Sequence, residues 1–139
     1  LVSIEQKPLK HCPQIKIIRI DMSVYFGSIN HIQNRIAKII ENEQIYHILI
    51  VGSGINFIDL AGAEALVTEN NRLKQHKGGL YFVGLKSAVY EFAARSHFIE
   101  HIGSDHFFDT KTIAFRELHR KLDSSICEQC NALIFRECH

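Results

Sequence analysis

A short apolar run that leads towards a helix start constrains the fold of this chain more than any other feature. The run His47-Ile48-Leu49-Ile50-Val51 is rich in β-branched side chains, which is typical of a central strand covered on both faces. A helix pattern extends from Ala61 to about Lys77, and Asp59 stands just before it. A carboxylate at that place accepts hydrogen bonds from the free N–H groups of the first helical turn. We therefore expect a strand followed by a helix that Asp59 caps.

The segment before this unit predicts another strand and another helix. An apolar run predicts a strand over residues 15–20, after two prolines that belong in an irregular or edge segment. Isoleucines at spacings of three and four predict the helix that follows, with Ser28 or Asn30 as its cap. One face of this helix carries Ile29, Ile32, Ile36, Ile39 and Ile40.

The segment after the central unit continues the alternation. Gly78-Gly79 ends the second helix, and apolar runs predict strands over 80–83 and 107–108. Between these strands we expect a helix that is capped by Ser87 and buries Val89, Phe92 and Ala93. A last helix presents Phe115, Leu118 and Leu122. This order predicts an α/β sandwich in which about four helices flank a mixed, mostly parallel sheet.

Composition and charge narrow the class of protein. A chain of 139 residues with 46% hydrophobic residues fits one domain with one core. Its 16 basic and 15 acidic residues are scattered, so nucleic acid is not an expected partner. No apolar run approaches the roughly 18 to 20 residues that a spanning helix needs, and no signal peptide is evident. The chain starts at Leu1 and its only methionine is Met22, so we expect a piece of a longer protein.

The segment from Ile48 to Leu66 carries a family resemblance. It joins an apolar strand, a Gly/Ser stretch, Asn56-Phe57-Ile58-Asp59 and a small-residue helix start, with Asp59-Leu60-Ala61-Gly62 at its centre. In this order the features resemble the STAS domain, which sulfate transporters and anti-sigma factor antagonists share. Within that family the chain is most similar to the C-terminal cytoplasmic domain of bacterial SulP anion transporters. We therefore expect a STAS domain with the SpoIIaa-like fold over residues 1–123 and a cysteine-containing tail over 124–139.

The resemblance also implies a function and a place in the cell. It implies a non-catalytic regulatory or interaction domain of a sulfate-type anion transporter, at the cytoplasmic face of the bacterial inner membrane. The implied partner is the transmembrane domain of the same polypeptide, while a cytosolic protein partner and a homo-oligomer stay open. The implied contact residues are Asn56, Asp59, Leu60, Ala61, Gly62 and Glu64. Leu60 and Ala61 either form an apolar docking surface or pack inward.

One position separates two branches of the family. The signalling branch is switched by phosphorylation of a hydroxyl residue two positions after the signature aspartate. Here that position is Ala61, and Leu60 precedes it, so neither residue accepts a phosphate. This departure favours the transporter branch. The alternative is a free-standing signalling module of the anti-sigma factor antagonist type, which binds a kinase or another protein.

Enzyme motifs are weak in this sequence. Gly52-Ser53-Gly54 lacks the third glycine of a dinucleotide fingerprint, because Phe57 stands in its place. Asp59 and Glu64 are the acids near the signature, and no histidine or cysteine lies close to them in sequence. His97, His101 and His106 do not follow a metal-binding spacing, and surface imidazoles are the usual explanation. We therefore do not expect an enzyme.

The cysteines near the end of the chain form a separate candidate site. Cys127, Cys130 and Cys138 either remain metal-free thiols or bind a zinc-type ion, since thiolates are zinc ligands and Cys-x-x-Cys pairs can reach one ion. The fourth ligand is left open among His139, Cys12, His11 and residues outside this sequence. Beyond this zinc, no cofactor is expected.

Overall fold

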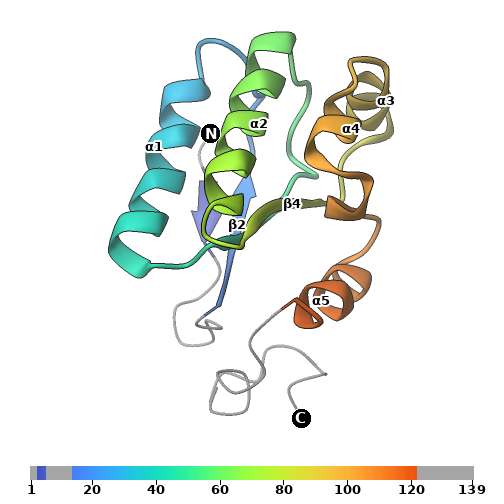
Figure 1. Cartoon of the computed structure of the whole chain (residues 1–139). Helices are drawn as coiled ribbons and strands as arrows, with labels where there is room; N and C mark the ends of the chain where they lie inside the picture. The colour runs from blue at the N-terminus through green and yellow to red at the C-terminus, as the bar shows by residue number, and fades with distance from the viewer. Residues whose placement is uncertain (1–2, 6–13, 122–139) are drawn as a thin grey trace.

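A five-stranded sheet forms the centre of the computed structural model, which describes residues 3–5 and 14–121 (Figure 1). The spatial order of the strands follows the chain, from β1 to β5. The strands are β1 (Ser3–Glu5), β2 (Ile15–Ile20), β3 (His47–Val51), β4 (Gly79–Val83) and β5 (Phe107–Phe108). The pairs β2–β3, β3–β4 and β4–β5 are parallel, whereas β1 runs antiparallel to β2. The predicted mixed, mostly parallel sheet is therefore confirmed.

Helices connect the parallel strands, as parallel neighbours require. They are α1 (Ile29–Lys38), α2 (Leu60–Lys74), α3 (Ser87–Arg95), α4 (Phe98–Ile102) and α5 (Lys111–His119). A π-helical turn, Ile39–Glu43, extends α1, and a 3₁₀ turn, Ser104–His106, precedes β5. In Figure 1, α1 and α2 lie side by side in front of the sheet, with α3 and α4 beyond α2. α4 was not predicted, because five residues are too few to show a helical period.

The two faces of the sheet carry separate cores, whereas the sequence predicted a single one. Side chains alternate along β2, so Ile18 and Ile20 enter the larger core while Ile15 and Ile17 enter the smaller one. The larger core also contains residues of α1, α2, α3 and α4, whereas Ala114 and Leu118 of α5 belong to the smaller one. β3 and β4 lie between the two, with Ile48, Leu49 and Ile50 fully buried. This matches the prediction of a central strand covered on both faces.

Two of the predicted helix caps are wrong. For α1, Asn30 lies inside the helix, and Ser28 stands at the N-cap position but its side chain makes no cap hydrogen bond. Its Oγ instead donates to the Ser23 carbonyl oxygen at 2.8 Å and accepts from the Tyr25 N–H at 3.1 Å, which closes the preceding turn. Ser87 is already the first residue of α3, and Lys86 takes the N-cap position without a side-chain bond.

The isoleucine face of α1 gives the first test of the fold. Ile36 is 0% exposed, so Ile36→Ala leaves a cavity and should lower the free energy of unfolding by roughly 2 to 5 kcal/mol. Ile113→Ala is the matched control. Because Ile113 is 38% exposed, this variant should lose much less free energy of unfolding. Urea unfolding of both variants measures the difference. Equal losses at the two positions would show that α1 does not pack as described.

Candidate functional site

The candidate site is the signature segment, residues 56–64, which includes the first turn of α2. Asp59 is the N-cap residue of α2, with extended backbone at φ −93° and ψ 178°. Its Oδ1 accepts a hydrogen bond from the Gly62 N–H at 2.7 Å. The predicted cap is thus confirmed, and it satisfies one of the N–H groups that a helix start leaves unpaired.

Backbone contacts hold the signature segment against the connection that follows β2. The Val24 N–H donates to the Phe57 carbonyl oxygen at 2.9 Å, and the Asp59 N–H donates to the Val24 carbonyl oxygen at 3.0 Å. These bonds make an isolated parallel bridge between Val24 and Ile58. Gly62 is buried at the same place, and a Cβ atom there would lie 2.3 Å from the Val24 carbonyl oxygen. Gly62 therefore has a structural role: it allows α2 to approach this backbone.

The outer side of the signature segment is apolar. Leu60 is 59% exposed and Phe57 is 50% exposed, whereas Ala61 is half-buried. Tyr25 and Phe26, from the connection after β2, are also exposed, and the Tyr25 and Phe57 rings lie 6.0 Å apart. We call these four residues, Tyr25, Phe26, Phe57 and Leu60, the apolar rim. Neighbouring exposed apolar side chains of this kind are typical of interaction surfaces, while single ones are common everywhere.

Shallow hollows flank the signature segment on two sides. One, between α2 and α4, is lined by Leu60, Ala63, Glu64, Val67, Ser96, Phe98 and His101. The other, beside α3, is lined by residues 56–59 together with Ala88, Val89 and Phe92. Asn56 lies at the second hollow, where its Oδ1 accepts a hydrogen bond from Lys86 Nζ at 2.6 Å. Most of the lining is apolar, so both hollows suit side chains of a partner better than an ionic substrate.

The structure brings the six predicted contact residues together but gives them different roles. Asn56, Leu60 and Glu64 are exposed, whereas Asp59 is engaged as the cap and Gly62 is buried. Sequence reasoning did not assign Tyr25, Phe26 and Phe57 to the site. Tyr25 and Phe26 reach it through the Val24 bridge, and the sequence carries no local signal for that bridge.

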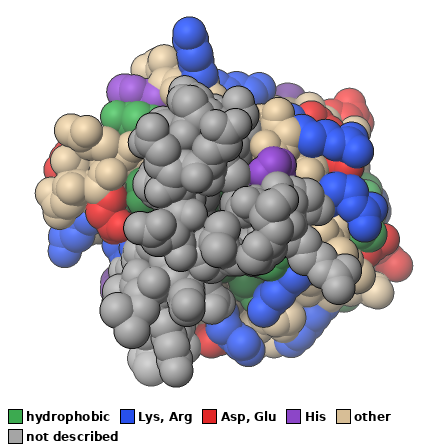
Figure 2. Space-filling view, turned by 90° about the horizontal axis from the view of Figure 1, so that it is seen from below, with side chains coloured by type: hydrophobic (Ala, Val, Ile, Leu, Met, Phe, Trp, Pro, Cys, Tyr) green, Lys and Arg blue, Asp and Glu red, His purple; other side chains and the backbone are tan. Residues whose placement is uncertain are grey.

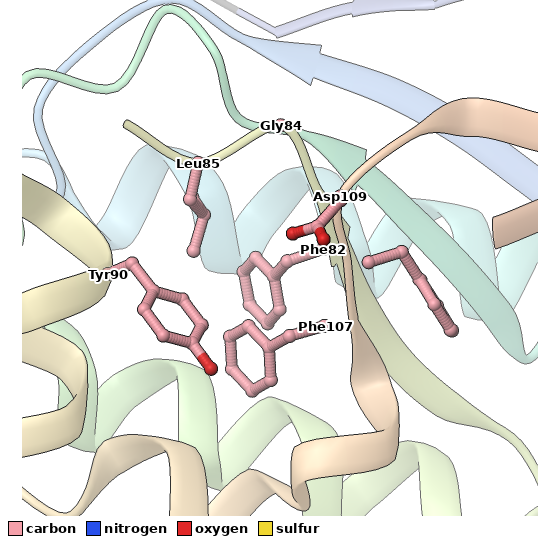
Figure 3. A pocket seen from close by; sticks show the side chains of 7 residues that line it. Phe82, Gly84, Leu85, Tyr90, Phe107 and Asp109 are labelled. Carbon is pink, nitrogen blue, oxygen red and sulfur yellow. The ribbon is translucent and has the colours of Figure 1, made fainter. Parts of the chain in front are cut away.

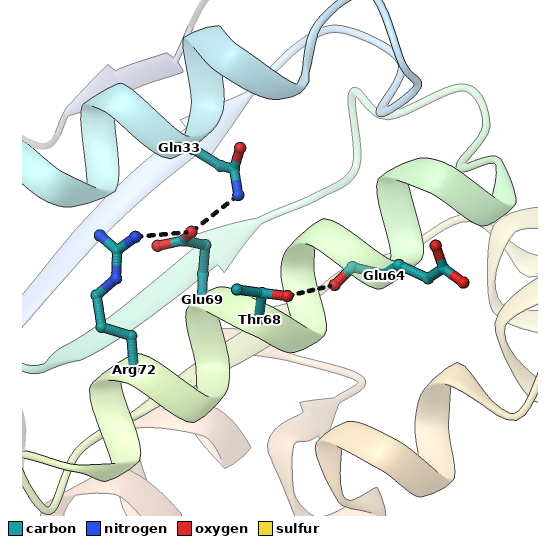
Figure 4. A network of polar contacts seen from close by, with 5 residues as sticks. All are labelled: Gln33, Glu64, Thr68, Glu69 and Arg72. Carbon is teal, nitrogen blue, oxygen red and sulfur yellow. Dashed lines mark hydrogen bonds and ion pairs between the residues drawn. The ribbon is translucent and has the colours of Figure 1, made fainter.

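A buried polar network fixes α2 against α1 (Figure 4). Glu69 is 0% exposed, and its Oε2 accepts a hydrogen bond from Gln33 Nε2 of α1 at 2.9 Å. Arg72 Nη2 lies 3.3 Å from the same oxygen. Burial raises the pKa of Glu69, and the Arg72 charge and the Gln33 hydrogen bond oppose that rise. A helical period could have flagged Glu69, because it falls between Leu66 and Leu73 on the buried face of α2.

Stacked rings occupy the N-terminal end of β3 and β4. The His106 ring lies 4.4 Å from the Tyr81 ring, and its Nδ1 lies 2.8 Å from the Leu80 carbonyl oxygen. His47 Nδ1 lies 3.4 Å from the Tyr81 hydroxyl. Burial lowers the pKa of His47 and His106 and raises the pKa of Tyr81 to about 12. His106 is therefore a core histidine, not the surface imidazole that the sequence predicted.

Metal ligation is supported nowhere in the part of the chain that the structure describes. Residues 3–5 and 14–121 contain no group of three or more His, Cys, Asp or Glu side chains placed to hold an ion. Cys127, Cys130 and Cys138 lie outside the described residues, so zinc binding by the tail stays a prediction. Figure 2 shows both basic and acidic side chains among the described residues at the margin of one face.

The buried histidine gives a pH-dependent prediction. His106 has a folded-state pKa below 6.5, so the unfolded chain binds more protons as the pH falls past that value. The contribution of neutral His106 is complete above about pH 6.5 and is lost progressively below it. His106→Asn, which can still donate to the Leu80 carbonyl, should reduce the fall in unfolding free energy between about pH 7.5 and 5, as measured in urea.

His101→Asn is the control, since His101 is exposed. This control should keep the pH dependence of the parent chain. The account of His106 is wrong if both variants retain the same slope. A remaining slope in His106→Asn is expected from His47, whose pKa is lowered by burial and by the charges of Lys121 and His106.

The described elements define an α/β domain with four parallel strands, an antiparallel edge strand and a capped segment at the carboxyl end of β3. The STAS domain family model matches residues 6–114, and the chain belongs to this family. The predicted family and fold are thereby confirmed. The predicted boundary between domain and tail at residue 123 has no test and stays a prediction.

The chain is similar in sequence to sulfate transporters, and its fold is similar to those of a sulfate transporter family protein and an anti-sigma factor antagonist. The chain is 28% identical over 97 residues to the putative sulfate transporter YvdB of Bacillus subtilis, covering 70% of this chain but only 18% of that protein. A sulfate transporter family protein from Wolinella succinogenes has a similar structure, with a TM-score of 0.63, 20% identity and coverage of 78% of this chain and 88% of the other. The unphosphorylated anti-sigma factor antagonist SpoIIAA gives a TM-score of 0.66 at 12% identity, covering 88% and 100%. At these identities the two structures show the fold alone.

The chain spans less than a fifth of the length of the curated transporters that it matches. Among the helices of the described residues, none has both the length and the apolar character needed to cross a membrane.

Proposed function

We propose that this chain is the non-catalytic cytoplasmic domain of a SulP-type anion transporter in a bacterial inner membrane. It regulates or assembles the transporter through protein contacts at the apolar rim. The proposal is supported by the similarity to curated sulfate transporters. The observation that carries the proposal is that Leu60, the first residue of α2, is 59% exposed. The start of this helix is held in place by the Asp59 cap.

The chemistry of the signature segment supports contact over catalysis. The Asp59 carboxylate is engaged in capping α2 through the Gly62 N–H. At Ala61 the chain offers a methyl group where the signalling branch carries its phosphorylated hydroxyl, so the surface cannot be switched there by added charge. A constant apolar surface suits a constitutive partner, such as the membrane part of the same polypeptide.

The alternative remains a free-standing signalling module that binds a kinase or another cytosolic protein. The likeness to SpoIIAA supports it only at the level of the fold. Both functions use the signature segment as a contact surface, so the identity of the bound protein distinguishes them.

Photo-crosslinking in the full-length protein tests the proposal. A benzoylphenylalanine in place of Phe57, which is 50% exposed and aromatic, should crosslink to the membrane part of the transporter. Adding Leu60→Asp should reduce the crosslink several-fold, because a carboxylate must then be desolvated at the contact. The unfolding free energy of the chain should change by less than about 0.5 kcal/mol, since Leu60 is a surface residue.

The same crosslinker at Ile113, an exposed apolar position on α5, serves as the control. It should capture little, and Leu60→Asp should not affect it. Capture of a cytosolic protein from position 57 would favour the signalling alternative. An undiminished crosslink in the Leu60→Asp background would remove the apolar rim as the contact.

A further inference from the structure

A smaller pocket, apart from the two hollows beside the signature segment, lies at the carboxyl ends of β4 and β5 (Figure 3). Phe82 forms its floor at the end of β4, and Gly84 and Leu85 follow that strand. Phe107 comes from β5, and Asp109 follows that strand directly. Tyr90 of α3 closes the remaining side. The carboxyl ends of parallel strands are the edge at which open α/β sheets usually bind their ligands.

Aromatic rings make most of this pocket. The Phe82 and Phe107 rings stack with centroids 5.1 Å apart and planes 10° apart. The Tyr90 ring lies 6.3 Å from Phe107 and stands nearly perpendicular to it, at 81°. Phe82 is buried, whereas Phe107 is half-buried and Tyr90 is 45% exposed, so Phe107 and Tyr90 are the rings that an occupant can reach. Such surfaces attract cations through the negative faces of the rings.

One charged group stands at the mouth of the pocket. Figure 3 shows the Asp109 carboxylate above Phe82, on the side of the pocket that faces Leu85. Within the part of the chain that the structure describes, no hydrogen bond or ion pair engages this carboxylate. A neutral apolar occupant would displace water from the carboxylate without replacing its hydrogen bonds, which is unfavourable. A cation would pair with it.

The size of the pocket selects the occupant. Its volume of about 60 Å³ holds a few waters and is far below the 300 to 1,000 Å³ of ordinary small-molecule sites. It therefore fits the end of one side chain. A guanidinium is planar, stacks on aromatic faces and offers a fork of N–H donors to a carboxylate, whereas an ammonium is a compact and strongly hydrated charge.

We propose that this pocket, formed by Phe82, Leu85, Tyr90, Phe107 and Asp109, is a docking site for an arginine side chain of a partner protein. The guanidinium lies against the rings and donates hydrogen bonds to the Asp109 carboxylate. The site is separate from the apolar rim and does not depend on the transporter assignment.

Titration of the full chain with a blocked Gly-Arg-Gly peptide, followed by NMR of the backbone amides, tests the proposal. We expect shifts centred on Gly84, Tyr90 and Asp109, with saturation in the millimolar range that one charged contact and one stacked ring can supply. The same peptide with citrulline, which keeps the shape but loses the charge, should bind about tenfold more weakly or worse. The lysine peptide should also bind more weakly.

Two variants complete the experiment. Asp109→Asn should weaken arginine-peptide binding by about tenfold or more, because it removes a charge-assisted hydrogen bond. Glu91→Gln, which removes the same charge from the exposed position next to Tyr90, should leave binding unchanged. An unchanged amide spectrum outside the pocket shows that Asp109→Asn still folds. Equal binding of arginine and citrulline, equal loss in the two variants, or shifts away from the pocket would overturn the proposal.

Discussion

The close approach of α2 to the backbone at Val24 is the contact on which the arrangement of the site depends. Gly62 permits it, because any Cβ at that position would lie 2.3 Å from the Val24 carbonyl oxygen. The same carbonyl accepts the Asp59 N–H, and Asp59 in turn caps α2 through the Gly62 N–H. Three residues therefore join the connection after β2, the signature segment and the helix start. Farther along α2, the buried contact of Glu69 with Gln33 fixes the helix against α1.

This anchoring has a consequence for the exposed side chains of the site. Tyr25 and Phe26 follow Val24 directly, and Phe57 and Leu60 flank its bridge partner Ile58 and the cap Asp59. The residues of the apolar rim therefore belong to two backbone segments that are hydrogen-bonded to each other. A surface that is ordered before binding loses less conformational entropy when a partner docks. Because residue 61 is an alanine, phosphorylation cannot add charge at that position, which suits the lasting contact with one transporter that we propose.

Local chemistry was predictable from the sequence, whereas long-range contacts were not. The Asp59 cap and the buried strands depend on residues close in the chain, and the structure has both. The family resemblance added the fold, and the family match confirmed it. The Val24 bridge and the place of His106 depend on which segments meet in space, so no local pattern reveals them. The burial of Glu69 could have been inferred from the helical period of α2, which places it between Leu66 and Leu73. Ser28 was assigned as a cap because its residue type suits one, but a neighbouring turn takes its hydroxyl.

The substitution Gly62→Ala tests the central claim most directly, because two effects predict changes of opposite sign in the free energy of unfolding. Helix propensity alone would stabilise α2 by about 1 kcal/mol. The contact with Val24 predicts instead a loss of roughly 1 to 3 kcal/mol from overpacking. Native-state hydrogen exchange should then show faster exchange of the Val24 and Asp59 amides, both of which are bonded in the bridge, while the β3 amides stay protected. A stabilised variant in which the Val24 and Asp59 amides exchange as slowly as before would contradict the account.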